Sequence, residues 1–226
     1  SNTLDSLISR FDLMGRSPVT LALSAYDFDL SVLDLFLPLA LGGHMVLVDE
    51  HQAMDAVVWA ELVSEFKVTL LGCAPALVGM LLEAARPDQL ASLQLVLTGG
   101  DRIPPTLAHA FRAAVPGLVF VGLGGATEAA IHSTAYIVDD SLPRETTAVP
   151  YGKPLDNVTM RVVGEDGCDA PDHVTGELWI GGRSLAEGYR GDPERTRDSF
   201  VLVAGKRWYR TGDLARYRPD GVVEIL

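Results

Sequence analysis

Three glycines stand close before a hydroxyl and a carboxylate in the segment VGLGGATEAAIHS, residues 121–133. Glycine gives the backbone left-handed angles and lets another group approach it closely. The segment follows a short apolar run typical of a strand, and ligands of α/β proteins bind at the carboxyl ends of strands. The pattern therefore indicates either a tight turn or a place where a polar ligand meets the backbone, with Thr127 and Glu128 beside it.

A dinucleotide-binding turn is one alternative for these glycines. Asp139, at the end of a later strand, resembles the acid that binds ribose in such folds. That fold requires a helix of about ten or more residues after the glycines. Only Glu128 to about His132 are available before the chain becomes extended. The sequence therefore disfavours a dinucleotide site.

Two further carboxylates lie in segments that suggest binding. Asp213, in RWYRTGDL, belongs either to a simple β-turn or to a site where a fixed carboxylate accepts hydrogen bonds from both hydroxyls of a ribose. Asp29, in YDFDLS, stands at the end of a strand and the start of a helix. It is either a helix cap or a functional acid.

The elements that would position these residues alternate between strand and helix over residues 19–122. Such alternation predicts βαβ units and a mostly parallel sheet layered with helices. Asp29 or Ser31 is expected to cap the helix that begins near Ser31, and Pro38 is expected to bend or shorten that helix. The expected strands are 19–25, 44–49, 68–72, 93–100 and 118–122, and the expected helices begin near Ser31 and at 52, 76 and 104.

Two of these helices carry an apolar stripe that predicts their buried faces. The predicted faces are Val32, Leu35, Phe36 and Leu39 in the first helix, and Val57, Val58, Leu62 and Phe66 in the second.

From about residue 134 the chain changes to short strands separated by Gly, Pro and Asp turns. This pattern predicts an antiparallel, β-rich, barrel-like portion with a hairpin at 219–221. We expect an α/β subdomain over residues 3–148 and a β-rich subdomain over residues 149–226.

Composition excludes several classes of protein. Of the 226 residues, 48% are apolar, so the chain can build a substantial core. The net charge of −12 argues against nucleic acid and anionic membranes as partners. Cys73 and Cys168 form neither a disulfide framework nor a zinc motif, and neither a signal peptide nor a long apolar stretch is evident. We expect a cytoplasmic protein with reduced thiols.

The motifs FDLS, GGATE, GELWIGG with SLAEGYRGDPERT, and YRTGDL occur in this order. In type, order and spacing they resemble the core motifs of adenylation domains of nonribosomal peptide synthetases. These domains belong to the adenylate-forming superfamily, together with acyl-CoA synthetases and luciferases. The resemblance covers the chain from about residue 17.

The resemblance implies activation of an amino acid by ATP and Mg²⁺, followed by transfer to the thiol of a carrier (thiolation) domain in a multidomain synthetase. Thr127 would hydrogen-bond the phosphate and Glu128 would hold the metal. The remaining nucleotide-binding positions implied by the resemblance are Gly99, Gly100, Asp101, Gly124, Gly125, Ala126, Tyr209 and Asp213.

Asp29 matches the acid that pairs with the α-ammonium of the substrate in members that activate α-amino acids. The loop LGGATEAAIHS is similar to that of cysteine-activating domains, but Leu33, Gly72 and His132 differ from that group. We expect a small or medium amino acid, with cysteine as one candidate, and His132 is either a pocket group or a structural histidine. The implied pocket consists of Asp29, Leu30, Leu33, Gly72, Leu97, Gly99, Leu123, Ile131 and His132.

The chain also departs from the family pattern. Gly122 stands where many members have an Asn that binds adenine, and Gly124 where many have an aromatic residue that stacks on it. We expect the backbone and neighbours such as Tyr209 to hold the base instead. The phosphate loop and the C-terminal subdomain, each with a lysine, are not found, so we expect residues 1–226 alone to show little adenylation.

Two alternatives remain open. The parent domain is degenerate and serves as a structural or docking element, or it is a stand-alone ligase of acyl or aryl acids. Asp29 argues against the second alternative, because such acids have no ammonium group to pair with it.

Overall fold

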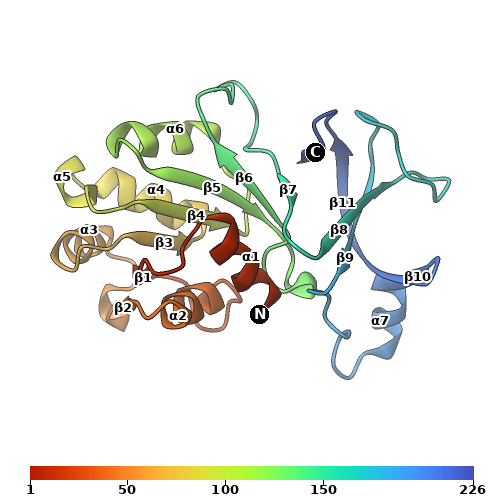
Figure 1. Ribbon diagram of the computed structural model, residues 1–226, viewed down its shortest axis with the longest axis horizontal. Helices are drawn as coiled ribbons and strands as arrows, with labels where there is room; N and C mark the ends of the chain where they lie inside the picture. Colours follow the sequence, from red (N-terminus) through yellow and green to blue (C-terminus); the bar gives the residue numbers. More distant parts are fainter. The chain divides into compact units, whose positions relative to one another are not determined.

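The computed structural model describes all residues 1–226, and most of its helices and strands are labelled in Figure 1. The chain forms two compact units. Unit 1 comprises residues 1–6, 123–136 and 150–226, and unit 2 comprises residues 7–122 and 137–149. No helix is long and apolar enough to cross a membrane.

The larger sheet confirms the expected parallel-rich arrangement. Its strand order is β2-β1-β3-β4-β5-β6-β7. The pairs β1–β2, β1–β3 and β3–β4 are parallel, whereas β6–β7 is antiparallel. Its strands are β1 (Val19–Ala22), β2 (His44–Leu47), β3 (Leu70–Cys73), β4 (Leu95–Gly99), β5 (Val119–Gly124), β6 (Thr134–Val138) and β7 (Lys153–Pro154).

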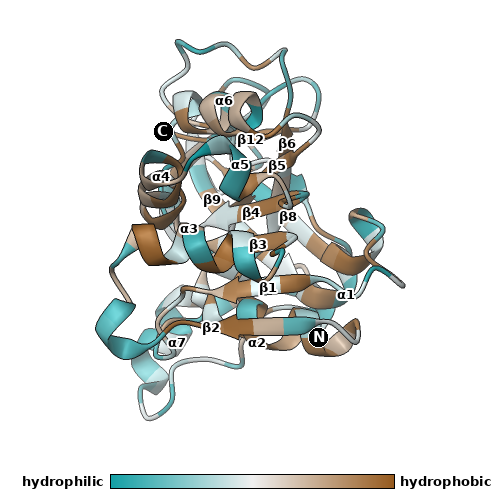
Figure 2. Cartoon of the chain, turned by 90° about the vertical axis from the view of Figure 1, so that its left-hand side faces the viewer, coloured by the Kyte–Doolittle hydropathy of each residue, from teal (hydrophilic) through white to brown (hydrophobic).

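The central strands of unit 2 are continuous apolar runs, as expected for strands buried on both faces. Every residue of β3 and β4 is buried, and Figure 2 shows hydrophobic colouring along β1, β3 and β4. The helices are α1 (Asn2–Arg10), α2 (Ser31–Ala40), α3 (Ala56–Glu65), α4 (Pro75–Ala84), α5 (Pro87–Leu90) and α6 (Pro105–Ala114), with a 3₁₀ turn η1 (Glu50–Gln52).

The predicted apolar faces of α2 and α3 are wrong. In α2, which packs against β1, β2 and β3, Leu33, Asp34 and Leu37 are buried, while Phe36 and Leu39 are exposed. In α3, Trp59, Ala60 and Val63 are buried, and Val57 and Phe66 are exposed. Both helices are apolar nearly all round, so periodicity alone does not set which face turns inward.

The start of α2 also differs from expectation. The N-cap position is Leu30, which has helical angles and no side-chain cap, so the first residue of the helix, Ser31, lies inside it rather than at the cap position. Pro38 lies inside α2 near its end, and the helix stops two residues later at Ala40. Pro38 is thus accommodated in the last turn of the helix.

Unit 1 contains the smaller sheet, which confirms the expected antiparallel portion. The strand order is β10-β11-β9-β8, and β12 pairs with β11. The predicted hairpin is present, because Gly221 has a positive φ of 78° and its N–H donates to the carbonyl of Arg218 at 2.9 Å. The elements are β8 (Val158–Val163), β9 (Gly176–Gly182), α7 (Pro193–Ser199), β10 (Phe200–Val203), β11 (Lys206–Tyr217) and β12 (Val223–Ile225).

A carboxyl group is buried on the inner face of α2. Asp34 is only 2% exposed, and one of its oxygens accepts a hydrogen bond from the Ser24 N–H at 3.1 Å. The other oxygen, Oδ1, has no hydrogen-bond partner. Burial raises the pKa of Asp34 from 3.8 to about 7, against the opposing effect of the hydrogen bonds from Ser24.

This carboxyl should make stability fall as the pH rises. Between about pH 4 and 7 the folded state holds a proton on Asp34 that the unfolded state has released, so unfolding becomes more favourable. Asp34→Asn removes this titration. At pH 8 its free energy of unfolding should exceed that of the native protein by roughly 2–4 kcal/mol, so it should unfold at a higher urea concentration. Urea titrations at pH 5 and pH 8 measure the difference.

The exposed Asp27 provides the matched control. Asp27→Asn should leave the difference between pH 5 and pH 8 unchanged. Identical pH profiles for Asp34→Asn and the native protein would contradict the role given to Asp34.

Candidate functional site

The glycine segment forms a closed loop at the carboxyl end of β5. Ser133 N–H donates to the carbonyl of Gly124 at 2.7 Å, which closes the loop. Within it, a 3₁₀ turn η2 (Thr127–Ala129) is followed by two non-glycine residues with positive φ, Ala130 at 56° and Ile131 at 76°. Such angles are strained for a β-branched residue. The surrounding structure therefore fixes the loop in this conformation.

Gly125 has no room for a side chain. A Cβ atom there would overlap the carbonyl oxygen of Ile131 and lie 2.6 Å from Cα of His132, both backbone atoms. This glycine is therefore needed for close packing of the two arms of the loop. Thr127 at the tip is exposed and Glu128 is half-buried.

Glu128 is held from two sides within unit 1. Its carboxylate Oε1 accepts a hydrogen bond from the Tyr189 hydroxyl at 2.6 Å, and its backbone carbonyl accepts one from Ala186 N–H at 2.8 Å. Tyr189 is itself fixed, because the guanidinium of Arg195 lies 4.0 Å above its ring and Phe200 packs at 5.9 Å between ring centroids. One oxygen of the Glu128 carboxylate thus has a set position.

Tyr209 belongs to the same cluster. Its ring lies 5.2 Å from Phe200, measured between centroids. Burial raises the pKa of Tyr209, and the hydrogen bond with Tyr189 and the nearby charge of Glu128 raise it further. Tyr209 therefore keeps its hydroxyl proton beside the carboxylate. Tyr189 was missed by the sequence reasoning, since its role appears only when the segment after β9 returns to the glycine loop.

Asp213 lies on an irregular part of β11. The register of β11 against β9 shifts between Arg210 and Leu214, and Gly212 has a φ of 79°. The predicted simple β-turn is therefore a bulge within one long strand. Asp213 is exposed, and partial burial raises its pKa.

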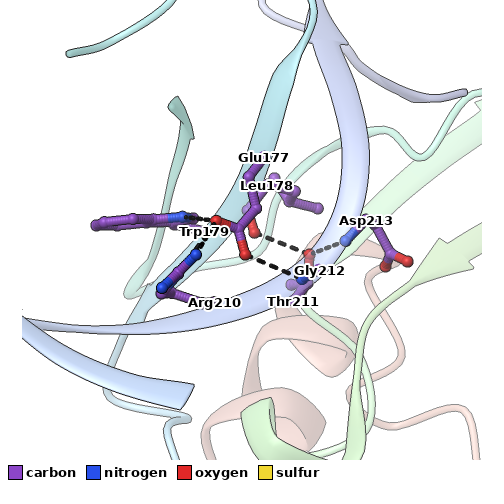
Figure 3. A network of polar contacts seen from close by, with 7 residues as sticks. All are labelled: Glu177, Leu178, Trp179, Arg210, Thr211, Gly212 and Asp213. Carbon is purple, nitrogen blue, oxygen red and sulfur yellow. Dashed lines mark hydrogen bonds and ion pairs between the residues drawn. The ribbon is translucent and has the colours of Figure 1, made fainter. Parts of the chain in front are cut away.

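A hydrogen-bonded network around Glu177 holds this bulge (Figure 3). The Glu177 carboxylate accepts hydrogen bonds from Trp179 Nε1 at 2.9 Å, Arg210 Nη2 at 2.9 Å and Gly212 N–H at 3.3 Å. Thr211 Oγ1 donates to the carbonyl of Leu178 at 2.8 Å and accepts from Asp213 N–H at 3.0 Å. The network fixes the backbone on both sides of Gly212 and presents the Asp213 carboxylate on the surface.

Several predicted substrate residues belong to unit 2. Asp29 is half-buried directly before α2, whereas Leu30, Leu33 and Leu97 are buried. A Cβ at Gly72 would lie 3.1 Å from Leu33 Cδ2 and 3.3 Å from Asp34 Oδ1, so this glycine sits against the start of α2. Gly99 ends β4, and the exposed Asp101 accepts a hydrogen bond from Arg102 N–H at 2.6 Å.

The other predicted substrate residues belong to unit 1. Leu123 is buried, Ile131 half-buried, and His132 only 2% exposed. Burial lowers the pKa of His132 to about 4, so the imidazole is neutral at pH 7. Its Nδ1 makes no hydrogen bond, so the ring has an unused polar atom in an enclosed place.

The donors fit a magnesium ion that is shared with phosphate rather than caged by protein. No group of three or more His, Cys, Asp or Glu residues is placed to hold a metal. Mg²⁺ is commonly bound through one or two carboxylates together with substrate phosphates. Glu128, half-buried and beside the glycine loop, provides one such carboxylate. That Asp29, Glu128 and Asp213 face one cleft stays a prediction.

The sequence and structure resemble known proteins. The family described as "AMP-binding enzyme" matches residues 1–190. Phenyloxazoline synthase MbtB of Mycobacterium sp. (strain MCS) is 49% identical over 225 residues, which cover 100% of this chain and 19% of that protein. Pyochelin synthetase PchE of Pseudomonas aeruginosa (strain UCBPP-PA14) is 46% identical over 236 residues, covering 100% of this chain and 16% of the other. The chain thus spans about a fifth of the length of the curated relatives it matches.

Solved structures give the same result. The nonribosomal peptide synthetase FmoA3 in its AMPPNP-bound form superposes with a TM-score of 0.93 at 38% identity, covering 100% of this chain and 25% of that one. The Vibrio cholerae adenylation domain AlmE, in complex with glycyl-adenosine-5'-phosphate, superposes with a TM-score of 0.87 at 27% identity. The match covers 99% of this chain and 42% of that one. PA1221, which contains adenylation and PCP domains, superposes with a TM-score of 0.84 at 30% identity. The match covers 94% of this chain and 37% of that one.

Proposed function

The chain belongs to the AMP-binding enzyme family and has the fold of adenylation domains of nonribosomal peptide synthetases. From this premise we propose that it forms part of a domain that activates an amino acid with ATP, giving an aminoacyl adenylate and pyrophosphate. The aminoacyl group then passes to the thiol of a carrier domain. The AMPPNP-bound and glycyl-adenylate-bound relatives support nucleotide use at this fold.

The observation that carries the proposal is the arrangement of unit 1. A closed glycine loop presents Thr127 on its exposed tip and Glu128 beside it, with the Glu128 carboxylate fixed by Tyr189. The same unit presents Asp213 as an exposed carboxylate on a hydrogen-bonded bulge. These groups match what a nucleotide requires, namely a donor for phosphate, an anionic metal ligand and an acceptor for two ribose hydroxyls.

In the proposed reaction, an oxygen of the substrate carboxylate attacks the α-phosphorus, the bond to the bridging oxygen breaks, and pyrophosphate leaves with that electron pair. Thr127 would donate to a phosphate oxygen and hold the phosphorus in line with the attacking oxygen. Mg²⁺ would be held by Glu128 and would offset charge on the phosphate oxygens. Asp213 would fix the ribose and thereby the register of the phosphate chain.

Asp29 supports an amino acid as the substrate. An α-ammonium group paired with a carboxylate contributes about 1.5–3 kcal/mol through a charge-assisted hydrogen bond. The apolar side chains of Leu30, Leu33 and Leu97, together with Gly72, suit a small or medium side chain in the pocket we propose. Cysteine stays one candidate, since a neutral His132 has a ring nitrogen that could accept a hydrogen bond from a thiol or hydroxyl.

The test is amino-acid-dependent exchange of labelled pyrophosphate into ATP by the product of the complete reading frame. Asp29→Ala should lower kcat/KM for the amino acid by about 10- to 100-fold, because the substrate ammonium loses its partner. Exposed Asp27→Ala should leave it unchanged. Undiminished exchange by Asp29→Ala would favour an acyl- or aryl-acid ligase, and no binding of ATP at all would favour a degenerate domain.

A further inference from the structure

Tyr151 occupies the space beside Gly124. A Cβ atom at Gly124 would lie 2.5 Å from both Cδ2 and Cε2 of the Tyr151 ring. The absence of a side chain at position 124 is therefore what admits this ring. The two residues are far apart in the sequence and meet within unit 1, where β5 ends and β7 begins.

The position of Tyr151 is fixed on both sides. Thr134 Oγ1 donates a hydrogen bond to the Tyr151 carbonyl and accepts one from Gly124 N–H at 3.2 Å. The next residue, Gly152, exchanges two backbone hydrogen bonds with Val223, at 3.1 and 2.9 Å. The backbone that carries the ring is thus held by the glycine loop and by β12, and the ring itself packs on Gly124.

The surroundings of the ring are those of the proposed nucleotide site. The glycine loop, with Thr127 and Glu128, begins at Gly124. The pKa of Tyr151 is raised by burial and, secondarily, by the carboxylate of Asp213, so the phenol is neutral and Asp213 is near. Tyr151 remains half-buried rather than enclosed. An aromatic ring therefore packs on the first glycine of the loop proposed to bind phosphate, near the carboxylate proposed to bind ribose.

Resting on the proposed function, we infer that Tyr151 is the residue against which the nucleotide base stacks in this chain. Many members of the family carry an aromatic side chain at the position of Gly124, which this chain lacks. Here the ring is supplied from the segment before β7 and reaches the place that the glycine leaves open. Tyr209, the sequence-based candidate, instead packs on Phe200 beside Glu128.

The experiment compares binding of ATP with binding of tripolyphosphate, which carries the phosphates but no base. Calorimetric titrations use the product of the complete reading frame. Tyr151→Leu should raise the Kd for ATP about tenfold, because base–aromatic stacking is lost. Its Kd for tripolyphosphate should be unchanged. Tyr151→Phe and Tyr151→Trp keep a ring and should bind ATP within about twofold of the native protein.

The half-buried Tyr136 in β6 of the same unit is the matched control, and Tyr136→Leu should bind both ligands normally. Native-like ATP binding by Tyr151→Leu overturns the inference, and so does an equal loss of ATP and tripolyphosphate, which would indicate a structural role. A native protein that binds no ATP overturns the proposed function itself. The inference about Tyr151 is supported if Tyr151→Leu loses affinity for ATP but not for tripolyphosphate, and Tyr151→Phe binds ATP with native affinity.

Discussion

Replacing Glu128 with glutamine should reduce amino-acid-dependent exchange of pyrophosphate into ATP by about 100- to 1,000-fold. Glutamine keeps the size of the side chain and can still accept the hydrogen bond that Tyr189 donates to Oε1. It removes the negative charge that we propose holds the metal beside the phosphates. The loss should therefore appear in kcat, while the temperature of thermal unfolding stays close to that of the native protein.

Two further variants separate charge from position. Glu187→Gln changes an exposed acid in the segment that folds back on the loop, and exchange should be unaffected. Tyr189→Phe keeps the charge of Glu128 but removes the hydroxyl that fixes Oε1, so its activity should fall between that of Glu128→Gln and that of the native protein. Exchange by Glu128→Gln within a few-fold of the native rate would show that this carboxylate is not the metal ligand.

Gly125→Ala should lower the free energy of unfolding by at least about 3 kcal/mol, because the new methyl group would overlap the backbone of Ile131 and His132. Backbone atoms cannot rotate away as a side chain can, so the closed loop between Gly124 and Ser133 must open or shift. Urea unfolding followed by tryptophan fluorescence measures the loss. We also expect exchange activity to be lost under conditions in which the variant remains folded.

Gly79→Ala is the matched control for this substitution. Gly79 lies inside α4, and a Cβ there would lie 3.9 Å from Leu107 Cδ1, which is an ordinary contact. Alanine is favoured over glycine in a helix, so this variant should be more stable by about 0.5–1 kcal/mol. If Gly125→Ala unfolds at the same urea concentration as the native protein, the loop is not closed as described.

The order of strands and helices could be predicted from the sequence because buried parallel strands appear as continuous apolar runs between helical segments. The faces of α2 and α3 could not be predicted in the same way. Their apolar residues surround the helix, and the buried face of α2 includes a charged residue, Asp34, which is only 2% exposed. Only packing against β1, β2 and β3 decides which side of α2 is buried.

In the candidate site, too, some residues could be predicted from the sequence and others could not. Thr127, Glu128 and Asp213 lie in short motifs whose residue types already indicate polar chemistry. Glu177 and Tyr189 act through hydrogen bonds between segments distant in the sequence, and no local pattern marks them. Tyr151 was hidden for the same reason, since its ring meets Gly124 only once the glycine loop and the start of β7 have folded together.

The packing of Tyr151 on Gly124 also constrains how this protein could have evolved. Any larger residue at position 124 would collide with the tyrosine ring, whereas loss of the ring alone would leave no aromatic group at that place. The effects of substitutions at these two positions should therefore not be additive, because the residue at each position decides what the other can hold.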